Sequence, residues 1–173
     1  VRVSDAIFKQ LSQAYLKIRN TCRYMLGNLS GFDPDRLVAP EEMQPLDRWA
    51  VTCLNQLIEK VMQGYEDFEY HIVYHAVYNF CVVDMSNFYL DVIKDRLYCE
   101  ETNGLLRRSA QTAMFLILDA MVRMLAPILA FTADEVWHAM PHRAGDDVGN
   151  VVFNQMPSAY ENYALSADEM ARW

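Results

Sequence analysis

The apolar residues between positions 4 and 29 constrain the fold of this chain most strongly. Seven of them follow one another at steps of three or four: Ile7, Leu11, Tyr15, Ile18, Cys22, Met25 and Leu29. This spacing places their side chains on one face of an α-helix. Ser4 is a suitable N-cap, and Gly27 and Asn28 can end the helix. The segment therefore predicts a long amphipathic helix with one face in a core.

The opposite face of this helix has a different chemistry. At about 100° per residue, Lys9, Asn20 and Arg23 point almost directly away from the apolar face. The side chains that flank them are Lys17, Arg19 and Tyr24. Cations that contact phosphates, an amide that reads a base edge and an aromatic ring that stacks are typical of RNA recognition. From composition alone, a solvated helix face explains the same residues.

The charge distribution bears on that choice. The whole chain has a net charge of −8, which is unfavourable for binding a polyanion. Residues 1–32 nevertheless have a local balance of +4, and the remainder has −12. One basic face on an acidic protein can still bind RNA.

Helical spacing continues along the chain. We expect a loop over residues 31–45, a helix from Leu46 or Asp47 to about Gly64, and a third helical stretch from about Phe68. That stretch has a break between Phe80 and Phe88 that the sequence does not place. A fourth helix is predicted over residues 105–124. A capping box formed by Thr132 and Glu135 predicts a fifth towards Met140.

These elements predict an all-α, up-and-down bundle of about five helices. We expect the bundle to occupy residues 1–140. Residues 141–173 are expected to form a C-terminal extension that packs on the bundle or trails from it, with a short extended piece at residues 151–153. The longest apolar stretch, residues 124–131, is interrupted by Pro127 and is much shorter than the ~20 residues of a membrane span. A soluble, cytoplasmic protein is therefore expected.

Sites for metals or catalysis are not predicted. The four cysteines are widely separated, so we expect reduced and mostly buried thiols rather than a zinc site. His71 and His75 lack the glutamate of an HExxH motif, and Pro141 separates His138 from His142. The acidic residues Asp84, Asp91, Asp95, Glu41 and Glu42 are best explained as solvated helix faces.

Five blocks stand out in order along this sequence: KIRNTCRYMLGNLSGFDP (17–34), LDRWA (46–50), NFYLDVIKDRLY (87–98), RRSAQTA (107–113) and LAPILAFTADEVW (125–137). Together they resemble the anticodon-binding domain of bacterial-type isoleucyl-tRNA synthetases. Valyl and leucyl enzymes share the helical bundle, but the IRNT and KDRLY motifs resemble the sequences of the isoleucyl enzymes more closely. In the family, VRVSD follows the catalytic domain, so we expect the sequence to begin inside a longer chain.

The resemblance implies a class I enzyme that activates isoleucine with ATP and Mg²⁺ and esterifies its tRNA. The HIGH and KMSKS motifs of that chemistry are not in this sequence, and no cofactor is expected here; a zinc site is possible in the family's later C-terminal region. The implied partners are the isoleucine tRNA anticodon stem-loop and the other domains of the synthetase. A protein-interaction bundle that uses its acidic surface, or the same module from a valyl enzyme, are the alternatives.

The resemblance also implies roles for individual residues. Asn20, Arg23 and Tyr24 are expected to contact the anticodon, and Lys17, Arg19 and Lys9 the phosphates. Tyr24 stands where the family more often has Phe, which leaves stacking intact. Two further sets are expected to be structural: Trp49, Tyr89 and Trp137 in the core, and Asp47–Arg48 with Lys94–Asp95–Arg96 as ion pairs at packing edges.

Overall fold

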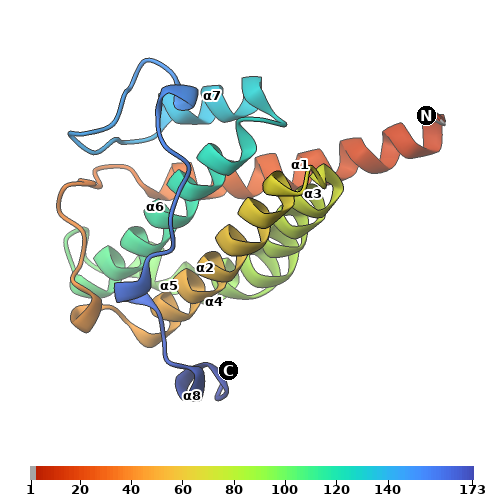
Figure 1. The fold of residues 1–173 in the computed structure, drawn as a ribbon. Helices are drawn as coiled ribbons and strands as arrows, with labels where there is room; N and C mark the ends of the chain where they lie inside the picture. The colour runs from red at the N-terminus through yellow and green to blue at the C-terminus, as the bar shows by residue number, and fades with distance from the viewer. Residues whose placement is uncertain (1–2) are drawn as a thin grey trace.

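The computed structural model describes residues 3–173, and the chain is built from helices (Figure 1). The elements in chain order are α1 (Asp5–Asn28), η1 (Pro40–Glu42), α2 (Pro45–Glu66), α3 (Tyr70–Asn79), η2 (Phe80–Tyr89), α4 (Leu90–Val92), α5 (Lys94–Cys99), α6 (Leu105–Leu125), α7 (Ala130–Ala139), η3 (Val151–Phe153), η4 (Glu161–Tyr163) and α8 (Ala167–Met170). Within residues 3–173 there is no β-strand, and five α-helices have ten residues or more. The predicted all-α class is therefore confirmed.

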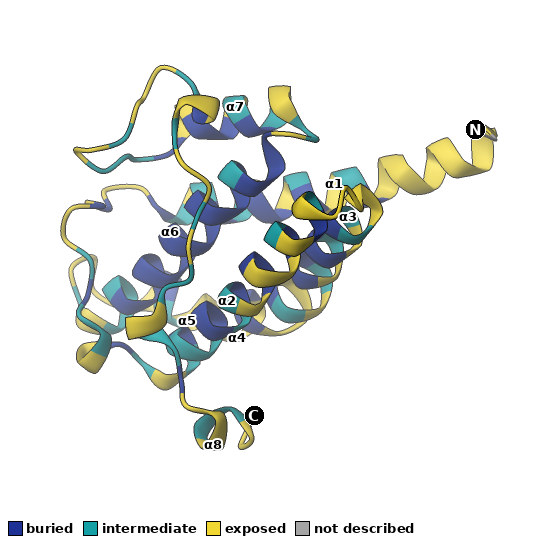
Figure 2. Ribbon diagram, viewed as in Figure 1, coloured by how far each residue is buried: buried dark blue, intermediate teal, exposed yellow. Residues whose placement is uncertain are grey.

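Helix α6 lies at the centre of the bundle and contacts α1, α2, α5 and α7. Every residue from Ser109 to Val122 is buried, so this helix is enclosed on all sides (Figure 2). A helix that is buried all round is expected in the middle of a larger domain. The loop over residues 31–45 is fastened to it, because the backbone amides of Val38 and Gln44 donate to the hydroxyls of Thr112 and Ser109.

The N-terminal part of α1 projects beyond the bundle (Figure 2). Ser4 caps the helix as predicted, since its hydroxyl accepts a hydrogen bond from the amide of Ile7. The prediction that the whole apolar face of this helix lies in the core is wrong, however, because Ile7 and Leu11 remain 43% and 46% exposed. The helix joins the core only from Ala14 onwards, where the other elements reach it.

The break expected between Phe80 and Phe88 is a change of helix type. Helix α3 continues into η2, a π-helix, and the chain stays helical through α4 as far as Ile93, a single turn residue between α4 and α5. A π-helix is wider than an α-helix and is rare in proteins. It lets one helical stretch bend along α1 and α2, both of which it contacts.

The turn between α2 and α3 is tight. Gly64, predicted as a helix end, lies inside α2, where a Cβ atom would come within 2.9 Å of the Val73 side chain. The two helices pack closely there because the glycine has no side chain. Phe68 then reverses the chain with a φ of 57°, a left-handed conformation that is uncommon for a bulky residue.

Two local predictions for the C-terminal third are wrong. Helix α7 begins at Ala130, so Thr132 is inside the helix and cannot cap it; its hydroxyl instead lies 3.0 Å from the hydroxyl of Tyr15. Residues Val151–Phe153 form a 3-10 turn and not an extended piece. In both cases a contact with another part of the chain accompanies the change, and Val151 is buried.

The last thirty residues run across α2 and α6 (Figure 1). Arg48, expected to pair with Asp47, instead donates to the backbone carbonyls of Tyr163 and Ala164, the latter at 2.6 Å. Near the start of the segment, Arg143 reaches the buried carboxylate of Asp119 at 3.1 Å. The boundary at residue 140 stays a prediction. No helix in residues 3–173 has the length and apolar content to cross a membrane.

Candidate nucleic-acid interface

The six predicted contact residues lie along the outer side of α1. At 100° per residue, the side chains from Arg19 to Lys17 cover an arc of about 160°. Lys9, Lys17, Asn20 and Arg23 are exposed, and Arg19 and Tyr24 are half-buried. Lys9 stands on the projecting part of the helix, two turns and ~12 Å before Lys17. The helix therefore presents one continuous ridge of cations and an amide.

The ridge separates two shallow grooves. On one side, Arg19 and Arg23 face α7 across a hollow of about 220 Å³. On the other side, Lys17, Asn20 and Tyr24 face η2 and α4 across a hollow of about 270 Å³. The structure thus brings all predicted residues except Lys9 to these two grooves.

The cations differ in how freely they can meet a phosphate. In residues 3–173, Arg19 is the one predicted cation with an ion pair, at 3.7 Å from the carboxylate of Glu135. Exposed pairs of this kind are weak and are screened by salt. Arg23 has no such partner in this part of the chain, so its guanidinium is the more available group.

Tyr24 is less free to stack on a base than a fully exposed aromatic side chain would be. Its ring packs on the core, and its hydroxyl is buried without a hydrogen bond. Burial, and then the neighbouring Tyr98 and Asp91, raise the pKa of Tyr24 to about 12. The tyrosine is therefore neutral at physiological pH, and only part of its ring can meet a base.

Helix α5 adds residues that the sequence had not predicted as contacts. Lys94 lines the same groove as Lys17, and Tyr98 is largely exposed beside Tyr24. The KDRLY block carries both, but charge spacing within it indicated only ion pairs. Their position depends on how the α3–α5 stretch folds back on α1, which no local pattern shows.

A buried polar network holds α5 in place. Arg96 donates two hydrogen bonds of 2.9 Å to the carboxylate of Asp47, one to each oxygen. The same carboxylate accepts from the hydroxyls of Tyr89 at 2.8 Å and Ser109 at 2.5 Å. Asp47 is fully buried, so the predicted edge ion pair lies in the interior and pairs with Arg96 rather than Arg48. Core burial is confirmed for Tyr89 and Trp137, while Trp49 is half-buried.

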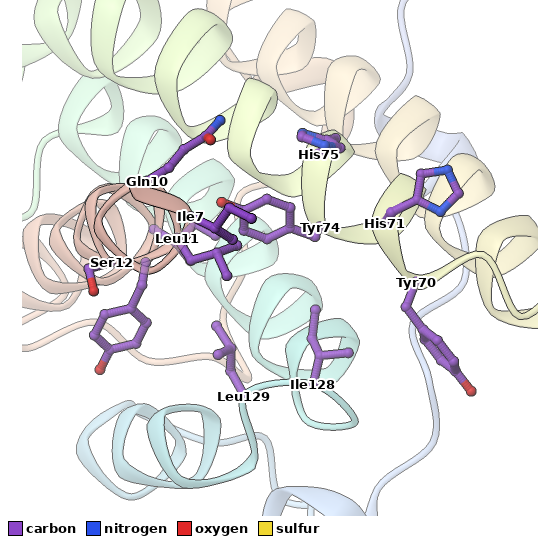
Figure 3. Close-up of a pocket in the computed structure, with 12 residues that line it drawn as sticks. Ile7, Gln10, Leu11, Ser12, Tyr70, His71, Tyr74, His75, Ile128 and Leu129 are labelled. Carbon is purple, nitrogen blue, oxygen red and sulfur yellow. The ribbon is translucent and has the colours of Figure 1, made fainter. Parts of the chain in front are cut away.

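A larger hollow lies elsewhere, between the start of α1, α3 and the turn before α7 (Figure 3). It has a volume of about 730 Å³, and its lining is mainly aliphatic, tyrosine and histidine side chains. Ile7, Leu11 and Tyr74 meet in its middle, and His71 lies at its outer side. It adds no lysine or arginine to the ridge, so its lining is apolar rather than phosphate-binding.

The remaining candidates for chemistry are dispersed. Asp91, Asp95, Glu41 and Glu42 are exposed as predicted, whereas Asp84 is half-buried and its burial raises its pKa. All four cysteines are free thiols: Cys22 and Cys81 are buried, Cys53 is half-buried and Cys99 is exposed. The expectation of mostly buried thiols is thus right except at Cys99.

Comparison with known proteins identifies the family. The sequence family described as "Anticodon-binding domain of tRNA ligase" matches residues 47–172, a segment that leaves out α1. The isoleucine–tRNA ligase of Syntrophotalea carbinolica is 53% identical over 95% of this chain, and that of Coxiella burnetii is 48% identical over all of it. The isoleucine–tRNA ligase of Desulfitobacterium hafniense is 49% identical over 98%.

In each case the chain spans 18% of the relative's length. The resemblance seen in the five sequence blocks is therefore confirmed across nearly the whole chain. The matches do not test individual contact residues. This helical chain, whose helix α1 carries the cationic ridge, belongs to the family of anticodon-binding domains of tRNA ligases.

Proposed function

We propose that this chain binds the anticodon arm of isoleucine tRNA as part of a longer, cytoplasmic isoleucine–tRNA ligase. The longer enzyme would join isoleucine to the tRNA with ATP and Mg²⁺, and this domain would hold the tRNA while the catalytic domains act. The observation that supports this most directly is the exposed ridge of α1, which lies in the part of the chain, residues 1–32, that has a balance of +4 within a net charge of −8.

The roles of the ridge residues follow from their exposure. Lys9 and Lys17 would contact phosphates, because they are exposed cations along one side of the helix, and the exposed guanidinium of Arg23 would contact the anticodon loop. Asn20 would read a base edge with its amide, which both donates and accepts. The exposed part of the Tyr24 ring would stack on an unpaired base, and Arg19 would contribute less while it pairs with Glu135.

The test is a titration of this chain with anticodon stem-loops, followed by NMR chemical shifts and by fluorescence anisotropy. We expect shifts confined to α1 and the two grooves, and tighter binding of the isoleucine loop than of the valine loop. Arg23→Ala should weaken binding roughly 5- to 30-fold, because a charged contact contributes about 1–2 kcal/mol, and should lower the salt dependence. Lys60→Ala is the matched control, since Lys60 is an exposed cation on α2 in a hollow beside α3.

Each alternative function has its own outcome. If neither stem-loop shifts any resonance at low salt, the proposal is wrong and a protein-interaction bundle is favoured. Preference for the valine loop would favour the valyl module. In the full-length ligase, Arg23→Ala should slow tRNA charging and leave isoleucine activation without tRNA unchanged.

A further inference from the structure

The groove between α1 and the η2–α4 stretch has a composition that cation contacts alone do not explain. Its lining residues are Lys17, Asn20, Thr21, Tyr24, Ser86, Leu90, Asp91 and Lys94. The two lysines come from opposite walls. Between them lie an amide, hydroxyl groups, an aromatic ring, a leucine and one carboxylate.

The carboxylate of Asp91 is the unexpected group. It is exposed, and it lies 2.5 Å from the ammonium group of Lys94. A carboxylate next to RNA phosphates is repelled by them, and it weakens the lysine that it pairs with. An ionised carboxylate only accepts hydrogen bonds, so its place in an RNA groove is favourable only when the RNA offers a donor. Bases offer such donors on their amino groups, and acidic side chains pair with the amino group of cytosine in this way.

The walls of the groove suit the rest of a base. The half-buried ring of Tyr24 and the side chain of Leu90 supply apolar surface for stacking and packing. The opposite wall is formed where the π-helix η2 passes into α4, and π-helical segments occur often at functional sites. The groove therefore combines polar groups, Asn20 on the α1 wall and Asp91 on the α4 wall, with the aromatic ring of Tyr24.

We propose that this groove binds one unpaired RNA base that carries an amino group. Asp91 accepts a hydrogen bond from the amino group, Asn20 pairs with a neighbouring position on the base edge, and the base packs against Tyr24. Lys17 and Lys94 lie at the two walls and neutralise the phosphates on either side. The inference rests on the proposed binding of the anticodon arm and adds the α4–α5 wall as its specificity-determining side.

Asp91→Asn tests this inference. A carboxylate that accepts a hydrogen bond from a base and a carboxylate that only repels phosphates predict opposite changes in RNA affinity when the charge is removed. The probe is a fluorescein-labelled isoleucine anticodon stem-loop. Its companions are loops in which one amino-bearing base at a time is replaced by an analogue without the amino group. If Asp91 reads a base, Asp91→Asn weakens binding of the unmodified loop about tenfold, the difference between a charge-assisted hydrogen bond and the neutral one that the amide oxygen can still accept. One substituted loop then binds the unchanged chain about tenfold more weakly and is insensitive to Asp91→Asn.

The matched control is Asp95→Asn, which removes the same charge from an exposed residue of α5 that does not line the groove. Equal or tighter binding by Asp91→Asn would overturn the inference, because the carboxylate would then only repel phosphates. So would a loss of the same size for all loops, since no base would be read. If the unchanged chain binds no stem-loop, the proposed function fails; if it binds and Asp91→Asn does not matter, only this inference fails. Circular dichroism checks that both variants fold.

Discussion

Replacing Asp47 by Asn is the sharpest test of how the bundle is held together. The carboxylate of Asp47 receives four donors: two from the Arg96 guanidinium, one from Tyr89 and one from Ser109. They are divided equally, with two at each oxygen. An asparagine has one amide oxygen and one NH₂ group, so either orientation of its amide places the NH₂ against a guanidinium N–H, which cannot accept, and forces the neighbouring hydroxyl to turn round.

The magnitude follows from burial. Asp47 is fully buried, and only 18% of the Arg96 side chain is exposed. Removing one partner of a buried ion pair leaves an uncompensated charge and costs about 3–5 kcal/mol. For a domain whose free energy of unfolding is about 5–15 kcal/mol, this is roughly a fifth or more of the total. In a chain of this size, it corresponds to a lowering of Tm by roughly 6–20 °C.

The assay is urea unfolding followed by circular dichroism at 222 nm. Asp47→Asn should lower the midpoint without changing the slope m, because the folded surface stays the same. Asp95→Asn, at an exposed position, should stay within about 0.5 kcal/mol of the unchanged chain. Because Arg96→Gln removes the same ion pair, the double variant should lose less than the sum of the single losses. A loss below about 1 kcal/mol for Asp47→Asn would refute the assignment of this network as a main support of the fold.

Two further outcomes can be measured on the same chain. Gly64→Ala should lower the free energy of unfolding by about 1–3 kcal/mol, because its new methyl group meets the Val73 side chain and α2 must shift from α3. Gly27→Ala, with open space around it, should be no less stable than the unchanged chain. In native buffer at pH 8, a thiol reagent should modify Cys99 alone, whereas in denaturant all four thiols should react. Burial supports this result at Cys22, where it raises the thiol pKa to about 12 and suppresses the reactive thiolate.

The helical periodicity of the sequence predicts which residues share a helix face, but it does not predict what covers that face. This is why Ile18 and Met25 are buried as expected while Ile7 and Leu11, on the same stripe, are exposed. The first turns of α1 extend past the end of the bundle, where no helix lies opposite most of their surface. Whether an apolar helix face is buried therefore depends on the lengths of helices that are distant in the sequence.

Local charge patterns have the same limit. Asp47 and Arg48 are neighbours in the sequence, but their side chains bind different groups. Asp47 pairs with Arg96, and Arg48 donates to backbone carbonyls near the C-terminus. A polar residue that is 49 positions away supplies the true partner. The TADE motif likewise satisfies a capping pattern, yet helix α7 starts earlier and Thr132 faces Tyr15 instead. Tertiary contacts decide between local options of similar energy.

The candidate RNA-binding surface has one side that could be predicted from the sequence and one that could not. Its α1 side could be predicted because one helix carries all six residues at readable spacing. Its second wall could not, because Lys94 and Asp91 reach the groove only through the π-helix and the fold of α3–α5 against α1. This second wall also depends on the core, since the buried Asp47–Arg96 pair ties α5, which carries Lys94, to α2. Residues 1–32 have a net charge of +4 and the rest of the chain has −12, so RNA would be attracted along α1 and repelled by most of the remaining surface. The negative net charge that argues against a general nucleic-acid binder is therefore compatible with the proposed binding of RNA from one side.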